Sequence, residues 1–300
     1  MVTTVTLNPA LDYVMRLPAL VPGKVNRASE VSLLPGGKGI NVSAVLHTLG
    51  AETRALGFTA GFTGAALEDA LARQGIPAAM IRLPQGFSRI NVKLKAGEES
   101  EINAPGPAVP PTAQEELLAA LAALPQGETL VLAGSIPPSL PKTLYGQILA
   151  RLEGMGVDAV VDAEGPLLAQ TLPHRPFLVK PNRAELAAFL QKTVDSEAAL
   201  QEGAARLQQL GARNVLVSLA GDGALLLDET RRYRRIAAPK GRVKNSVGAG
   251  DSMVAGFLAS WQKSRDYGEA LRLGTAAGSA TAFSEGLASR EMIERVLAEL

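Results

Sequence analysis

The segment 245–252 holds two glycines directly before a stretch with helical periodicity. It reads Asn-Ser-Val-Gly-Ala-Gly-Asp-Ser, and apolar residues recur at helical spacing from Met253 to Trp261. The free N–H groups at a helix start and the positive end of its dipole bind anions, and glycines let a phosphate approach the backbone. Asp251 could act as a general base there or only cap the helix. We therefore expect an anion site with a carboxylate beside it.

A second glycine-rich turn precedes an earlier helical stretch. Residues 35–42 read Pro-Gly-Gly-Lys-Gly-Ile-Asn-Val, so Lys38 lies among three glycines. Backbone N–H groups around one positive charge suit sugar hydroxyls and a phosphate, although a tight turn with a solvated lysine would look the same. A lysine buried here without an anionic partner would be costly, which favours a phosphorylated sugar.

Asp12 follows the first expected strand, at the carboxyl edge where open α/β sheets bind ligands. An exposed loop aspartate is the alternative.

The expected elements place these turns at strand–helix junctions. Short β-branched runs alternate with helical periodicity, which is typical of βαβ units around a buried parallel sheet. The expected strands are 2–7, 55–58, 129–133, 157–162, 177–179 and 215–219, and the clearest helices are 41–49 and 65–74. We predict a doubly wound, mostly parallel α/β sheet flanked by helices, with a barrel as the alternative.

Two segments break this alternation and predict a small antiparallel β lid. The first is a hairpin, in which residues 89–95 alternate apolar and polar side chains and residues 100–103 look extended after a polar turn. The second is the segment 12–34, which is non-helical, is broken by Pro18, Pro22 and Gly23, and could supply the other strands of the lid. A sheet with one polar and one apolar face must cover substrate or a second subunit. The predicted organisation is a core of residues 1–11, 35–86 and 106–300 and a lid of residues 12–34 and 87–105, with a possible homodimer through the lid.

The composition of the chain limits the classes of partner that it can bind. The 300 residues carry 30 basic and 29 acidic side chains, so no bulk field recruits nucleic acid or membrane. The absence of cysteine excludes thiolate chemistry, and two histidines are too few for most zinc sites. Residues 1–8 resemble a strand rather than a leader, and no apolar run approaches the roughly 20 residues needed to cross a bilayer. We expect a cytoplasmic protein with small-molecule ligands.

Five motifs occur in an order that resembles one enzyme family. They are Asn8–Asp12, Gly36–Asn41, Gly134–Pro138, Lys180–Glu185 and Val247–Asp251. They resemble the ribokinase-like carbohydrate kinases of the phosphofructokinase B type, in particular the branch of 1-phosphofructokinase and tagatose-6-phosphate kinase, over essentially the whole chain. The resemblance implies ATP and Mg²⁺ as cofactors and phosphoryl transfer to a ketose phosphate. Fructose 1-phosphate is the leading substrate, with tagatose 6-phosphate or fructose 6-phosphate as alternatives.

The resemblance also implies a role for each matching residue. Asp251 would be the catalytic base, and the backbone N–H groups of Gly248, Ala249, Gly250 and Asp251 would hold the transferred phosphoryl group. The implied substrate ligands are Asp12, Gly37, Lys38, Asn41 and Arg89. The implied nucleotide ligands are Lys180, Asn182, Ser218, Gly221, Gly223 and Ser279, and Asn182 and Glu185 would organise Mg²⁺ mainly through water. Ala104 departs from the family's Asn-Glu-x-Gly pattern, so the glutamate found there is missing from the predicted Mg²⁺ environment.

Two other classes of function stay open. A dinucleotide-dependent oxidoreductase would need a G-x-G-x-x-G turn after the first strand, where Asn8 and Pro9 stand instead. A non-catalytic sugar-phosphate sensor would keep the pocket but would have no need of Asp251.

Overall fold

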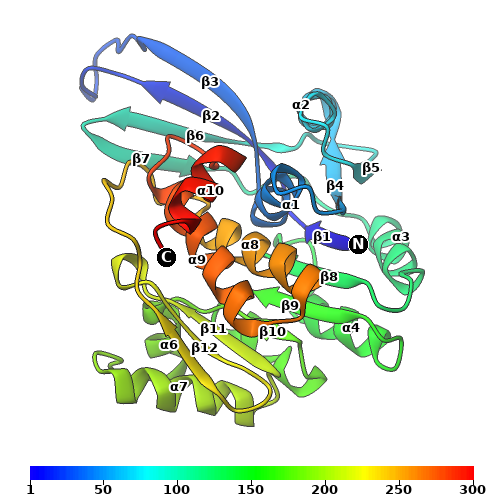
Figure 1. The fold of residues 1–300 in the computed structure, drawn as a ribbon. Coiled ribbons are helices and arrows are strands. Elements are labelled where there is room, and N and C mark those ends of the chain that lie inside the picture. The colour runs from blue at the N-terminus through cyan, green and yellow to red at the C-terminus, as the bar shows by residue number, and fades with distance from the viewer.

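The expected βαβ units form one large sheet, to which a smaller second sheet is attached (Figure 1). The computed structural model describes residues 1–300 apart from the side chain of Glu98. The strands of the large sheet are β1 Val2–Thr6, β4 Thr53–Ala60, β5 Ala78–Leu83, β8 Thr129–Ala133, β9 Asp158–Asp162, β10 Leu178–Val179, β11 Asn214–Ser218, β12 Ala224–Leu227 and β13 Tyr233–Ile236. Those of the small sheet are β2 Ala10–Arg16, β3 Glu30–Gly36, β6 Arg89–Ala96 and β7 Glu98–Asn103.

The large sheet is mostly parallel. Its order is β13-β12-β11-β10-β9-β8-β1-β4-β5, and only the β11–β12 and β12–β13 pairings within the described chain are antiparallel. The central strands β1 and β8 are buried along their whole length, as expected of strands covered by helices on both faces. The predicted doubly wound sheet is confirmed. The barrel alternative is wrong, because β13 and β5 remain unpaired edges in the described sheet.

Helices cover both faces of this sheet (Figure 1). They are α1 Lys38–Thr48, α2 Gly61–Arg73, α3 Pro111–Ala122, α4 Leu144–Leu152, α5 Gly165–Ala169, α6 Arg183–Leu190, α7 Glu197–Gln209, α8 Ala249–Ser264, α9 Tyr267–Ala282 and α10 Arg290–Leu297. The apolar sides of α1, α8, α9 and α10 form one core with the sheet, and those of α3, α4 and α7 form the other. Among the described residues, no helix is both long and apolar enough to cross a membrane.

The small sheet is the predicted lid, and it projects from the carboxyl edge of the large sheet (Figure 1). Its order is β3-β2-β6-β7. The outer pairs are antiparallel, but β2 and β6 run parallel, so the expectation of a wholly antiparallel lid is wrong. The reason is that β2 and β6 both leave the core, while β3 and β7 return to it. The two outgoing strands pair at the centre.

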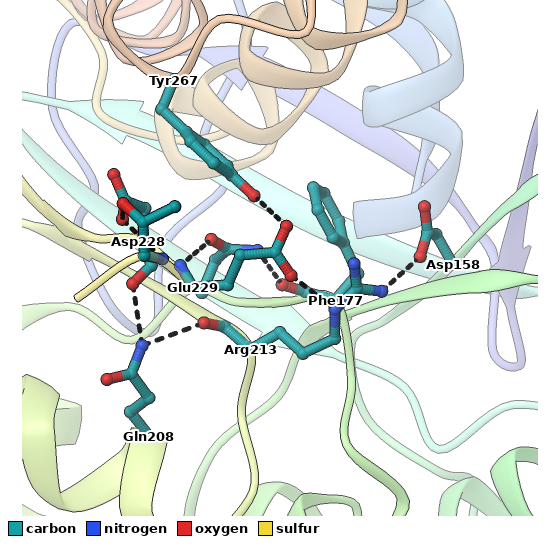
Figure 2. Close-up of polar contacts among 9 residues, drawn as sticks. Asp158, Phe177, Gln208, Arg213, Asp228, Glu229 and Tyr267 are labelled. Carbon is teal, nitrogen blue, oxygen red and sulfur yellow. Dashed lines mark hydrogen bonds and ion pairs between the residues drawn. The ribbon is translucent and has the colours of Figure 1, made fainter. Parts of the chain in front are cut away.

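Polar side chains at the amino edge of the large sheet form a clamp, shown in Figure 2. The Arg213 guanidinium donates to Asp158 Oδ1 at 2.6 Å and to Glu229 Oε2 at 2.9 Å, and the Tyr267 hydroxyl donates to Glu229 Oε1 at 2.6 Å. The same guanidinium lies 5.1 Å from the centre of the Phe177 ring. Burial alone would raise the pKa of Glu229, but the Tyr267 and Arg213 hydrogen bonds lower it below its usual value.

The clamp joins strands whose opposite ends reach the carboxyl edge of the large sheet. Asp158 begins β9, Arg213 precedes β11 and Glu229 follows β12, while Tyr267 begins α9. The opposite ends of β9 and β11 carry Asp162 and Ser218, at the carboxyl edge. The clamp therefore fixes the strands that support that edge.

Replacing Arg213 with alanine should destabilise the fold. The change leaves Asp158 and Glu229 without their cation, so we expect the free energy of unfolding to fall by about 1–3 kcal/mol. Urea unfolding followed by circular dichroism measures the loss. The control is Arg290→Ala, which breaks an exposed ion pair with Glu294 and should cost about 0.5 kcal/mol or less. Equal losses in the two variants would contradict the clamp.

Candidate active site

A cleft of about 510 Å³ opens at the carboxyl edge of the large sheet, under the lid and beside the start of α8. It brings together ligands predicted from segments far apart in the sequence. The predicted residues that line it are Asp12, Gly37, Lys38, Asn41, Arg89, Lys180, Asn182, Glu185, Ser218, Gly248, Gly250 and Asp251.

Within the described chain, the other predicted residues do not line this cleft. Ala249 uses its N–H to donate to the Ser246 carbonyl at 3.2 Å. Gly223 has a φ of 92°, and a Cβ there would lie 2.1 Å from the Ile236 carbonyl oxygen, so the turn itself requires glycine. Gly221 lies in the same turn, and Ser279 is half-buried on α9. Nucleotide contact by these residues stays a prediction.

Asp251 lies in the first turn of α8 but does not cap it. Its side chain is buried, and its Oδ2 accepts a hydrogen bond of 2.8 Å from the Asn41 amide. Burial and the nearby Asp162 carboxylate raise the pKa of Asp251 to about 6, although Asn41, Lys38 and Lys180 pull it downward. A carboxylate with this pKa is ionised at neutral pH and still basic enough to accept a hydroxyl proton. The geometry thus favours the general base over the helix cap.

Backbone N–H groups beside Asp251 are the predicted anion site. Gly248 precedes α8 with a φ of 79°, a left-handed conformation that favours glycine, and it lines the cleft together with Gly250 and Asp251. Since the Ala249 N–H already has an acceptor, the groups left for a phosphoryl oxygen are those of Gly248, Gly250 and Asp251. A Cβ on Gly250 would lie 3.1 Å from Lys180 Nζ. A larger residue there would displace the lysine.

Asp162 is a central residue that the sequence analysis missed. It ends β9, its side chain is 2% exposed, and its two oxygens lie 3.3 Å from Lys38 Nζ and 3.4 Å from Lys180 Nζ. Burial would lower the pKa of Lys38, but Asp162 and Asp251 outweigh it and raise that pKa. Lys38 therefore has an anionic partner within the protein, so the premise that it lacks one, from which we inferred a phosphorylated sugar, is wrong. The available signal was the position of Asp162 at the end of an expected strand.

Asp12 lies on the lid rather than at the end of β1. It is the third residue of β2, and its oxygens accept from the Asn91 amide at 3.0 Å and lie 3.1 Å from Lys93 Nζ. A Cβ on Gly36 would lie 2.7 Å from the Asp12 carboxylate. This glycine is thus required to make room for Asp12.

Arg89 begins β6, and Ser135 follows β8 on the other side of the same pocket. Arg89 Nε donates to the Asn8 carbonyl at 3.0 Å. Among the described residues Arg89 forms no ion pair, and burial lowers its pKa although Asp12 opposes this. A smaller hollow of about 300 Å³ is lined by Arg89, Lys38 and Ser135. Ser135 belongs to a motif that the sequence analysis noted without assigning it a role.

Asn182 and Glu185 form a capping box at the start of α6. Asn182 Oδ1 accepts from the Glu185 N–H, and Glu185 Oε2 accepts from the Asn182 N–H, both at 2.8 Å. Both residues also line the cleft, and Asn182 pairs with Ser218 through an isolated bridge. The reciprocal hydrogen bonds therefore hold both side chains in place at the start of α6.

Comparison with known proteins agrees with this arrangement. The model of the pfkB family of carbohydrate kinases matches residues 5–293. A 1-phosphofructokinase from Bacillus subtilis is 42% identical over 100% of this chain and 98% of its own. A D-tagatose-1-phosphate kinase from Bacillus licheniformis is 36% identical over 100% and 98%. Phosphofructokinase-2 from Escherichia coli, solved with fructose 6-phosphate, has a TM-score of 0.93 and 29% identity over 99% and 98%, and it also has a tetrameric inhibited form.

An α/β sheet with a β lid, an anion site at a helix start and a buried carboxylate beside it define a phosphoryl-transfer enzyme. The chain belongs to the pfkB family of carbohydrate kinases, and it is an ATP-dependent sugar kinase. The oxidoreductase alternative is thereby excluded.

Replacing Asp251 with asparagine should lower kcat by about 100- to 10,000-fold while leaving the fold intact, because the general base is removed. Steady-state kinetics and circular dichroism measure both quantities. A variant within tenfold of the wild type would show that Asp251 is not the base.

The pH dependence provides a second readout of the same group. In the wild type, kcat/KM should fall tenfold per pH unit below about pH 6, where Asp251 becomes protonated. Its folded pKa lies above the unfolded value, so the native state binds more protons between the two, and ionised Asp251 costs stability at neutral pH. The asparagine variant should therefore be at least as stable as the wild type at pH 7. A less stable variant would contradict the raised pKa.

Proposed function

We propose that the chain transfers the γ-phosphoryl group of MgATP to fructose 1-phosphate, giving fructose 1,6-bisphosphate. The observation that carries a phosphorylated substrate is Arg89, a half-buried guanidinium that forms no ion pair in the described chain and lies beside Lys38 and Ser135. A dianionic phosphate is its natural complement. The names of the two sequence relatives support a ketose carrying its phosphate on C1.

The mechanism assigns one task to each part of the cleft. Asp251 accepts the proton of the attacking hydroxyl, and Asn41 holds the carboxylate in place. The N–H groups of Gly248, Gly250 and Asp251 stabilise charge on the transferred phosphoryl group, and Lys180 lies beside them. Asp12 and Asn41 bind sugar hydroxyls, while Arg89, Lys38 and Ser135 bind the phosphate already on the sugar.

The residues present fit a Mg²⁺ ion held mainly through water. Glu185 commits one carboxylate oxygen to the capping box, and its other oxygen forms no hydrogen bond within the described chain. A single carboxylate oxygen, together with nucleotide phosphates and water, is the donor set that Mg²⁺ prefers. When bound, the ion would neutralise developing phosphate charge, and Asn182 would keep Glu185 oriented.

Tagatose 1-phosphate is the principal alternative substrate, because one relative carries that name. Our earlier alternatives, tagatose 6-phosphate and fructose 6-phosphate, place the phosphate on C6, and the second is the sugar bound in the Escherichia coli structure. The sugar-phosphate sensor is excluded, since the chain belongs to the pfkB family of carbohydrate kinases and is an ATP-dependent sugar kinase. We also propose a cytoplasmic location, as expected from the sequence.

A coupled assay for ADP release over fructose, fructose 1-phosphate, tagatose 1-phosphate and fructose 6-phosphate tests the proposal. We expect kcat/KM to be highest with a ketose 1-phosphate. Arg89→Met should raise KM for that substrate by about 10- to 150-fold, corresponding to about 1.5–3 kcal/mol, and KM for ATP by less than threefold. The same variant should leave the weak activity on free fructose nearly unchanged. Equal losses with and without the phosphate would show that Arg89 does not bind it.

The outer face of the lid supports a homodimer. Alternation along the strands places Tyr13 and Met15 on the face opposite Asp12, next to Val31 and Leu33 in the registered pairs of β3. Val31, Leu33 and Ile102 are 48%, 50% and 62% exposed. A flat apolar sheet face of this kind packs well against a second copy of itself. We propose that two chains associate lid to lid.

Leu33→Asp should convert the dimer to a monomer, because it buries a charge between the two sheets. Size-exclusion chromatography with light scattering measures the mass. Leu210→Asp is the control, since Leu210 is an exposed apolar residue just after α7 and far from the lid. A wild-type protein that is monomeric at micromolar concentration would refute the lid interface.

A further inference from the structure

The inner face of the lid carries a line of charged side chains over the cleft. Lys93 on β6 lies at its centre, with its Nζ 3.1 Å from Asp12 Oδ2 on β2 and 3.5 Å from Glu101 Oε1 on β7. Asn91 binds the other oxygen of Asp12 at 3.0 Å. Asp12, Lys93 and Glu101 all line the catalytic cleft.

Lys93 is buried and stays charged. Its side chain is only 10% exposed, and a buried ammonium is costly unless it is paired. Burial would lower the pKa of Lys93, but Asp12 and Glu101 outweigh this and raise it. The ammonium has three hydrogens, of which the two carboxylates take two. One hydrogen is left for an acceptor in the cleft.

The neighbouring position on the same strand shows that lid cohesion does not require such a pair. Lys95 lies two residues further along β6, on the same inner face, and is registered with Glu99 of β7. Lys95 and Glu99 form no ion pair among the described residues, and both strands remain paired there. A buried lysine at position 93 is thus better explained by the cleft that it faces.

We propose that Lys93 is a positioning and specificity-determining residue for the sugar, and that it holds one ketose hydroxyl jointly with Asp12. Asp12 accepts the hydrogen of this hydroxyl, and Lys93 donates its third hydrogen to the oxygen. The inference rests on the proposed function, because it needs a ketose phosphate as substrate. Both hydrogen-bonding functions of the hydroxyl are used. An analogue without this hydroxyl leaves the third hydrogen of Lys93 without an acceptor and is strongly rejected.

The test is a cycle of side chain against substrate hydroxyl. Lys93→Met and the matched control Lys95→Met are assayed with the preferred ketose 1-phosphate and with its analogues deoxygenated at C2, C3 and C4. We expect Lys93→Met to raise KM for the parent sugar at least tenfold while changing KM for ATP less than twofold. With one of the three analogues, Lys93→Met should cause no further loss in kcat/KM. Lys95→Met should behave as the wild type throughout.

Other outcomes overturn the proposal. Equal losses of Lys93→Met with the parent sugar and all three analogues would make Lys93 a structural member of the lid. An unchanged KM in a folded variant would exclude any sugar contact. If Lys93→Met does not fold, Lys93→Arg decides, because it keeps the charge but moves the donors. Under the proposal it raises KM for the parent sugar at least threefold, whereas a purely structural pair would leave KM unchanged. A wild type inactive on every ketose phosphate would refute the proposed function itself, before any variant is made.

Discussion

The buried carboxylate of Asp162 is the interaction on which the charge balance of the cleft depends. Lys38 begins α1 and Lys180 follows β10, yet both ammonium groups lie against this one side chain. Without it, two like charges would face each other in a poorly solvated space. With Asp162 present, each ammonium lies against one oxygen of the same carboxylate. The negative charge of Asp162 also raises the pKa of Asp251. One residue thus contacts both lysines and raises the pKa of the proposed base.

The remaining ionic groups of the cleft follow the same rule of local pairing. Lys93 balances Asp12, and Asn41 supplies a hydrogen bond to Asp251. Among the cations that line the cleft, Arg89 is the exception, because its guanidinium forms no ion pair in the described chain and donates to main-chain carbonyl groups. Lys38, Lys93 and Lys180 each have a carboxylate partner, so Arg89 is the cation left to bind an anionic substrate group. We therefore expect selectivity to come from this local cation rather than from a general positive field, which agrees with a net charge of +1 for the whole chain.

Local features of the sequence predicted the parts of the site that local physics controls. Glycines at helix starts, an aspartate in a first turn and β-branched runs each indicate a conformation within a few residues, and strand 129–133 was predicted to the residue.

Contacts between distant segments were not predictable in this way. Asp162 and Lys38 are 124 positions apart, and Asn41 and Asp251 are 210 apart. The parallel pairing of β2 with β6 likewise depends on where both strands leave the core, which no local pattern records. The family motifs located the cleft, but they did not reveal that Ala249 uses its N–H within the chain or that Asn182 and Glu185 cap each other.

The pairing of the two central strands of the lid also determines how far each part of the lid would move in a rotation. Both strands start at the core, so a rigid rotation of the lid would turn about the line through Ala10 and Arg89, which are opposite each other in the register. At about 3.3 Å per residue, Asp12 lies roughly 7 Å from this line and the far end of β2 roughly 20 Å from it. A swing of about 10° would then move Asp12 by roughly 1 Å but the far end by about 3–4 Å. Such a rotation would move the far end most, and it would have to break the hydrogen bond of 2.6 Å that Arg16, the last residue of β2, donates to Glu285 Oε2 of the core.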